Sequence, residues 1–149
     1  MERRIVGVDF GTRRVGIALS DPLRLFAQPL GTYAPDEAIE VVGGIADRDG
    51  VEVIVFGWPL DADGNENAST ERVAAYADRV AQRLANHEPP VTIEKWDERG
   101  SSREAVEELI RAGAKRKQRG RGGAADRVAA AIILQQYLDE RNAGHSGAF

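Results

Sequence analysis

Two β-rich segments stand next to each other at the start of the chain, and they limit the folds that the rest of the sequence can complete. Residues 5–10 (IVGVDF) are mostly apolar, which is typical of a buried strand. Gly11 and Thr12 interrupt this run, and apolar residues then alternate with small ones over 15–20 (VGIALS). The pattern predicts a β-hairpin that begins a sheet.

Strand and helix patterns alternate after this hairpin. The predicted elements are, in order, a strand over about 26–33, a helix from 35 that ends at Gly50, a strand over 51–56, a helix around 73–84, a strand over 91–96, a helix over 101–112 and a last helix over 124–141. An antiparallel meander followed by strand–helix alternation predicts an α/β fold: a mixed five-stranded sheet with helices on both faces.

The length of the chain favours a single domain. A chain of 149 residues can bury one core of ordinary size. We assign residues 1–141 to this domain and expect 142–149 to be a flexible tail. No stretch approaches the roughly 20 apolar residues of a membrane span, and the short apolar run at the start is not a signal peptide. The sequence therefore predicts a cytoplasmic protein that does not bind membranes.

Several kinds of chemistry are excluded by composition. The chain has no cysteine, so disulfides and thiolate metal sites cannot form. It has only two histidines, His87 and His145, which argues against a structural zinc site and against a histidine-based catalytic triad.

Carboxylates stand at the ends of predicted strands. Asp9 ends the first strand, Asp97 and Glu98 end the fifth, and Asp126 begins the last helix. Ligand sites in open α/β sheets gather at the carboxyl ends of parallel strands, so these side chains are predicted to share one edge of the sheet. Each also has a structural reading: a turn residue, a solvated strand end, or an acid that complements a helix dipole.

Taken together, these carboxylates indicate a metal site. Clustered carboxylates repel one another unless a cation lies between them, and a donor set made only of oxygen suits Mg²⁺ or Mn²⁺. Two such ions can activate water for phosphodiester hydrolysis, so a metal-dependent nuclease is the expected activity. Successive side chains of a strand point to opposite faces, so only one of Asp97 and Glu98 is expected to bind metal directly.

Positive charge is concentrated in one segment, although the net charge of the chain is −4. The cations that we predict to bind nucleic acid are Lys115, Arg116, Lys117, Arg119 and Arg121. This Gly-rich segment leads directly to Asp126, and Arg13 and Arg14 are predicted to extend the same patch. The alternative is a solvated charge run without a partner.

Four motifs resemble those of the YqgF/RuvX family, in the family's order and spacing. They are VDFGTRRVGIALSD (8–21), GWPLDADGNE (57–66), WDERGSS (96–102) and ADRVAAAIIL (125–134). Two positions depart from the usual family pattern: Trp58 stands where leucine is usual, and Gly100 stands where an apolar residue is usual.

The resemblance implies a ribonuclease H-like fold, similar to that of the junction resolvase RuvC. It also implies that Asp9, Glu98 and Asp126 are the catalytic, metal-binding residues. The activity that it implies is a nuclease that matures the 5′ end of 16S rRNA, so that RNA (pre-16S rRNA) is favoured over DNA as the substrate. A pre-ribosomal particle is then an expected partner, and the chain is expected to act as a monomer or homodimer.

Three alternatives stay open at the level of sequence. A Holliday-junction resolvase would use the same residues on DNA, as a two-fold dimer. A nucleotide-binding protein would use Asp9, Gly11 and Thr12 as a phosphate loop, although actin-like proteins need two such domains. A non-catalytic ribosome-assembly factor would bind RNA through its basic segment. Trp58 has two readings as well: it could stack on a base or pack in the core.

Overall fold

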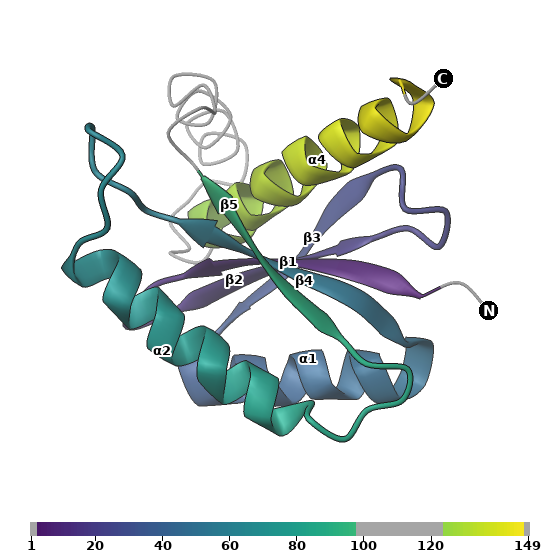
Figure 1. Cartoon of the computed structure of the whole chain (residues 1–149). Helices are drawn as coiled ribbons and strands as arrows, with labels where there is room; N and C mark the ends of the chain where they lie inside the picture. Colours follow the sequence, from purple (N-terminus) through teal and green to yellow (C-terminus); the bar gives the residue numbers. More distant parts are fainter. Residues whose placement is uncertain (1–2, 98–123, 148–149) are drawn as a thin grey trace.

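A computed structural model of the chain describes residues 3–97 and 124–147 (Figure 1). The elements are β1 (Arg4–Phe10), β2 (Val15–Ser20), β3 (Ala27–Tyr33), α1 (Pro35–Asp49), β4 (Val51–Trp58), α2 (Ala68–Arg83), β5 (Thr92–Asp97) and α4 (Ala124–Gly147). The predicted helix over 101–112 lies outside the described residues. No helix in the described ranges is both long and apolar enough to cross a membrane.

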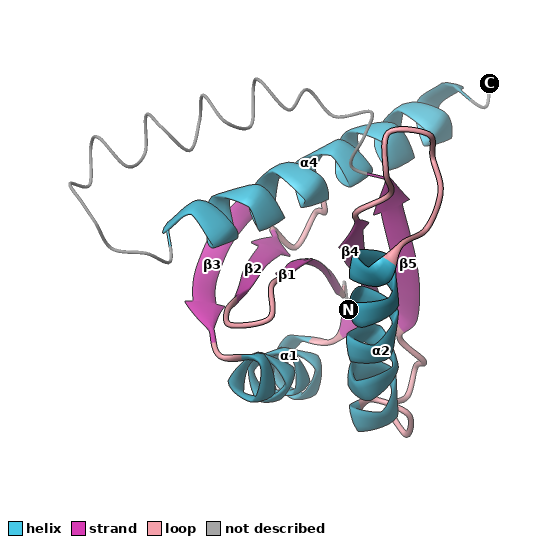
Figure 2. Cartoon of the chain, turned by 90° about the vertical axis from the view of Figure 1, so that its left-hand side faces the viewer, coloured by secondary structure: helices cyan, strands magenta, loops and turns pink. Residues whose placement is uncertain are grey.

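The five strands form one mixed sheet in the order β3-β2-β1-β4-β5. The first three pair antiparallel, whereas β1, β4 and β5 run parallel to one another. Helices α1 and α2 cover one face of this sheet and α4 crosses the other (Figures 1 and 2). The structure thus confirms the predicted α/β fold with helices on both faces.

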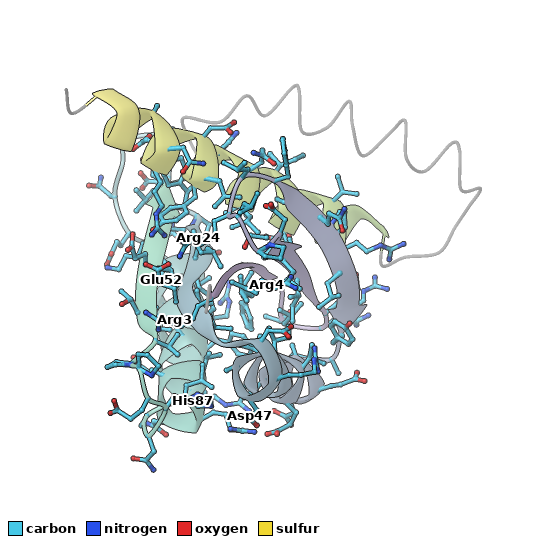
Figure 3. All side chains as sticks on the ribbon, turned by 90° about the vertical axis from the view of Figure 1, so that its right-hand side faces the viewer. Arg3, Arg4, Arg24, Asp47, Glu52 and His87 are labelled. Carbon is cyan, nitrogen blue, oxygen red and sulfur yellow. The ribbon has the colours of Figure 1, made fainter. Side chains whose placement is uncertain are left out.

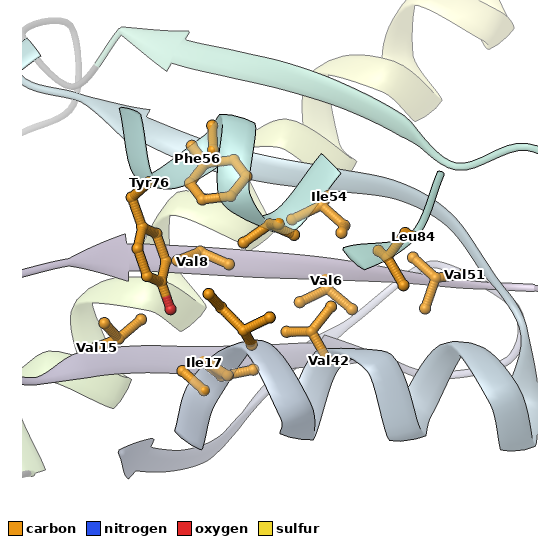
Figure 4. Close-up of a cluster of buried hydrophobic side chains, with 14 of the residues drawn as sticks. Val6, Val8, Val15, Ile17, Val42, Val51, Ile54, Phe56, Tyr76 and Leu84 are labelled. Carbon is orange, nitrogen blue, oxygen red and sulfur yellow. The ribbon is translucent and has the colours of Figure 1, made fainter. Parts of the chain in front are cut away.

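Side chains of β1 alternate between two cores. Val6 and Val8 lie in the core under α1 and α2, which also contains Phe56 and Tyr76 (Figure 4). Ile5 lies in the core under α4, together with apolar residues of that helix. This alternation fixes the direction of every β1 side chain, including the acidic one near its end.

Close approach of α4 to the sheet depends on small residues in the strands. A Cβ atom added to Gly7 would stand 2.7 Å from the Cβ of Leu134, so the absence of a side chain at Gly7 lets the helix lie directly on β1. Leu134 and Leu138 are fully buried in this contact.

Helix α4 continues to Gly147, beyond the predicted end at Arg141. Tertiary contacts explain the extension. Arg141 donates a hydrogen bond of 2.9 Å to Glu52 of β4, and Asn142 donates one of 3.2 Å to the carbonyl of Arg24. Arg24 also binds Glu52, at 2.7 Å, so one carboxylate joins the β2–β3 connection to α4 (Figure 3). The flexibility of 142–149 stays a prediction.

Two ion pairs and one histidine–carboxylate contact join α1 to α2 and to the residues that follow it. Arg79 pairs with Asp36, and Arg83 lies 3.3 Å from Glu40. His87 lies 2.8 Å from Asp47 (Figure 3). These contacts hold the two helices side by side on their face of the sheet. Surface pairs of this kind contribute little individually, about 0–1 kcal/mol each.

Candidate active site

Asp9 lies at the carboxyl end of β1, on the face that α4 covers. Ile5 and Gly7, which contact α4, share its side of the strand because side chains alternate. In the β1–β2 pairing Asp9 stands opposite Gly16. The sequence prediction that Asp9 ends the first strand at a sheet edge therefore agrees with its observed place.

Gly16 brings the start of α4 to this point. A Cβ atom on Gly16 would stand 2.1 Å from the carbonyl oxygen of Asp126, a distance that no real side chain could occupy. The first turn of α4 therefore lies directly against β2, beside the strand position that carries Asp9. Asp9 and the residue that begins α4, Asp126, are far apart in the sequence but both lie next to Gly16 at one edge of the sheet.

The surroundings of Asp126 disfavour its charged form. Partial burial raises the pKa of this carboxyl above its usual value, and the nearby Arg14 guanidinium, 3.7 Å away, lowers it by a smaller amount. A cation at this position would offset the cost of keeping the carboxylate ionised. Within residues 3–97 and 124–147, however, no three acidic or histidine side chains gather as a complete metal site.

Asp97 lies on the opposite face of the sheet from Asp9. Its neighbour Trp96 packs against α4, where the indole donates a hydrogen bond of 3.0 Å to Gln136 and meets the Tyr137 ring edge to face. Alternation then turns Asp97 away from α4. Lys95, on the same side as Asp97, lies over the ring of Trp58 at 4.5 Å. Glu98 lies outside the described residues.

A pocket of about 300 Å³ opens beside Asp9. Its wall is formed by the carboxyl ends of β1 and β4, with the residues that follow them, and by the start of α2: Asp9, Phe10, Gly11, Thr12, Gly57, Pro59, Ser69, Arg72 and Val73. The predicted site residues include neither Ser69 nor Arg72. The start of a helix directly after the 57–67 loop is the sequence signal that could have suggested them, since such loops end at the site edge of an α/β sheet.

Trp58 is a core residue. It is 6% exposed, lies among the side chains under α1 and α2, and donates a hydrogen bond of 3.2 Å from its indole to Glu66. Of the two readings of this tryptophan, packing is therefore the one that the structure supports. Base stacking would need an accessible ring face.

Of the predicted nucleic-acid-binding residues, the structure describes Arg13. It is exposed in the turn between β1 and β2, at the same sheet edge as Asp9. The other five, Lys115, Arg116, Lys117, Arg119 and Arg121, lie outside the described residues, as does Gly100.

Solved structures define the class of fold. The chain is similar to Thermus thermophilus RuvC, with a TM-score of 0.52 and 16% identity over 93% of this chain and 95% of that one. It is also similar to RuvC of the same organism in complex with a Holliday junction substrate, with a TM-score of 0.51. The mixed sheet with its carboxylate-bearing edge is thus a ribonuclease H-like α/β fold.

Sequence comparison then gives the family. The family described as "RuvX: Holliday junction resolvase" matches residues 3–140, and the chain belongs to this family. A protein of Salinibacter ruber is 47% identical over 93% of this chain and 94% of its own length. One of Chlorobaculum tepidum is 44% identical over 94% and 96%. Both carry the name "Putative pre-16S rRNA nuclease".

Proposed function

We propose that this chain is a metal-dependent endonuclease that hydrolyses phosphodiester bonds during maturation of the 5′ end of pre-16S rRNA. The observation that supports the proposal is that Asp9 and the first turn of α4, which carries Asp126, both lie next to Gly16 at one edge of the sheet. The names of full-length relatives support the RNA substrate. A cytoplasmic location and a pre-ribosomal particle as partner belong to the same proposal.

The donor set consists of Asp9, Asp126 and Glu98. We prefer Glu98 to Asp97 because Asp97 turns away from the Asp9 face and because the resemblance of the 96–102 motif implies Glu98. Carboxylate oxygens fit Mg²⁺ or Mn²⁺, and the raised pKa of Asp126 fits a carboxyl that needs a cation beside it. Such ions, when bound, supply Lewis-acid activation of water and stabilisation of the leaving oxygen.

The remaining residues of the proposed site position the substrate. Arg13 lies where it can contact a phosphate that flanks the cut, and the cations of 115–121 would extend this contact along the strand. Arg14 neutralises part of the charge of Asp126, which limits the repulsion between the two carboxylates.

Cleavage of two substrates, assayed in parallel, tests this function. One substrate is a 16S precursor RNA with its 5′ leader, and the other is a four-way DNA junction. Each is incubated with Mg²⁺, Mn²⁺ or chelator and with the native chain, Asp9→Asn or Asp78→Asn. Asp78 is an exposed acid on α2, away from the pocket, so its variant is a control for the loss of one carboxylate.

Metal-dependent cleavage of the RNA by the native chain and by Asp78→Asn, but not by Asp9→Asn, is the expected result. A second candidate function is resolution of DNA junctions, which the family description favours. Symmetric cleavage of the junction by a dimer would move the assignment to that activity. RNA binding without cleavage under any metal would instead indicate an assembly factor.

A further inference from the structure

The pocket beside Asp9 crosses the end of the sheet. Asp9 lies on the α4 side, whereas Phe10, the next residue, lies on the side of α1 and α2, with its ring centroid 4.6 Å from that of Tyr76. Both residues line the pocket, and its far wall belongs to α2. A nucleic-acid strand held at Asp9 can therefore continue over the strand end toward α2.

Arg72 differs from the other arginines of α2. Arg79 and Arg83 each pair with an acid of α1. Arg72 lines the pocket, and in the described part of the chain its contact is a long one, 3.4 Å, from its guanidinium to the hydroxyl of Ser69. A guanidinium carries five donors, so this contact leaves most of them available for a ligand.

Backbone amides at the start of α2 are already occupied. The side chain of Asn67 accepts hydrogen bonds from the amides of Ser69 and Thr70, at 2.8 and 3.2 Å. The hydroxyl of Thr70 accepts one from the amide of Asn67 in return. Because these amides take part in the capping box, an anion at this position would be bound by the side chains of Arg72 and Ser69 instead.

We propose that Arg72, with Ser69, binds a substrate phosphate next to the one that is cleaved, and that the intervening nucleotide lies unpaired in the pocket. The inference rests on the proposed nuclease function. An arginine fork is well suited to phosphate, and Phe10, Pro59 and Val73 give the pocket apolar surface for a base or sugar. A volume of about 300 Å³ has room for one nucleotide but not for a duplex.

Binding to a short single-stranded oligoribonucleotide of the leader, followed by fluorescence anisotropy, tests the subsite. The Asp9→Asn chain is used to prevent cleavage, alone and combined with Arg72→Ala, Arg72→Lys or Arg79→Ala. Arg79→Ala removes the same charge from the same helix outside the pocket. Thermal unfolding of each variant shows that it is folded.

Arg72→Ala is expected to weaken binding about tenfold. The slope of log affinity against log salt should become shallower by about 0.7, the value for one phosphate contact on a single strand. Arg72→Lys should restore the slope but only part of the affinity. A neutral methylphosphonate at one position next to the cut should weaken binding by the parent chain and have no further effect in Arg72→Ala.

Equal affinity and equal salt slope for Arg72→Ala and Arg79→Ala would overturn the subsite. A methylphosphonate effect that is independent of Arg72 at every position would also overturn it. If the native chain cleaves RNA while one of these two results is obtained, the subsite is refuted but the nuclease function is still supported. Arg72-dependent binding without cleavage under any metal would refute the nuclease function but support the phosphate contact, and absence of any binding would refute both.

Discussion

Gly16 carries no side chain at the point where the carbonyl oxygen of Asp126 rests on β2, and a Cβ atom there would stand 2.1 Å from that oxygen. Gly16→Ala should therefore displace the first turn of α4. We expect a loss of about 1–3 kcal/mol in the free energy of unfolding, as in other overpacked sites, and a large loss of RNA cleavage.

Gly44→Ala is the matched control. A Cβ atom on Gly44, in α1, would meet nothing within 4 Å, so this variant should be more stable by about 0.5–1 kcal/mol and should cleave normally. Chemical denaturation and cleavage rates of both variants test the comparison. Normal cleavage by Gly16→Ala would contradict the role that we give to the contact between β2 and α4.

Asp126→Asn should abolish cleavage without loss of stability. Burial raises the pKa of Asp126 in the folded chain, so the folded state holds the proton more tightly than the unfolded state. The ionised carboxylate therefore lowers stability, and this loss develops as the pH rises through the folded pKa. In chelator, the variant should match the native chain in acid and exceed it at neutral pH. Lower stability of Asp126→Asn at neutral pH would contradict this reading.

Glu52→Gln should destabilise the chain at neutral pH. Burial raises the pKa of Glu52, but Arg141 and Arg24 outweigh it, and the net shift is downward. The stabilisation is therefore present above the unfolded pKa and is lost as the pH falls through the lower folded value. We expect a loss of about 1–2 kcal/mol at neutral pH and none in strong acid, measured by urea unfolding. Glu140→Gln, at an exposed position of α4, controls for the loss of charge.

Trp58→Leu introduces the residue that is usual in the family and tests the packing role. Trp58 is almost fully buried, so the smaller side chain should cost about 2 kcal/mol through lost contacts and a partial cavity. Cleavage per folded molecule should stay close to the native value. A marked loss of RNA affinity with unchanged stability would instead support stacking on a base.

The order of the elements and the sheet type could be predicted because each depends on local pattern. Alternation of apolar and small residues with a period of two predicted β2. The change to alternating strand and helix patterns predicted the mixed sheet. The end of α4 could not be predicted, because Asn142 is held by the carbonyl of Arg24, a contact distant in sequence.

The places of two candidate site residues could be predicted in the same way. Strand ends indicate Asp9 and helix starts indicate Asp126, since topology alone brings them to one edge. The face to which Asp97 points could not be predicted, because it follows from the packing of Trp96 against α4. The place of Arg72 in the pocket wall could not be predicted, because it depends on how α2 packs against the ends of β1 and β4.

The two described carboxylates of the proposed site belong to different layers of the molecule: Asp9 to the sheet and Asp126 to α4, the last described element in the chain. Any local opening that lifts the first turn of α4 from Gly16 would therefore separate the two carboxylates while β1 and β2 stay paired. The docking of a helix on one glycine thus decides whether the proposed centre is assembled.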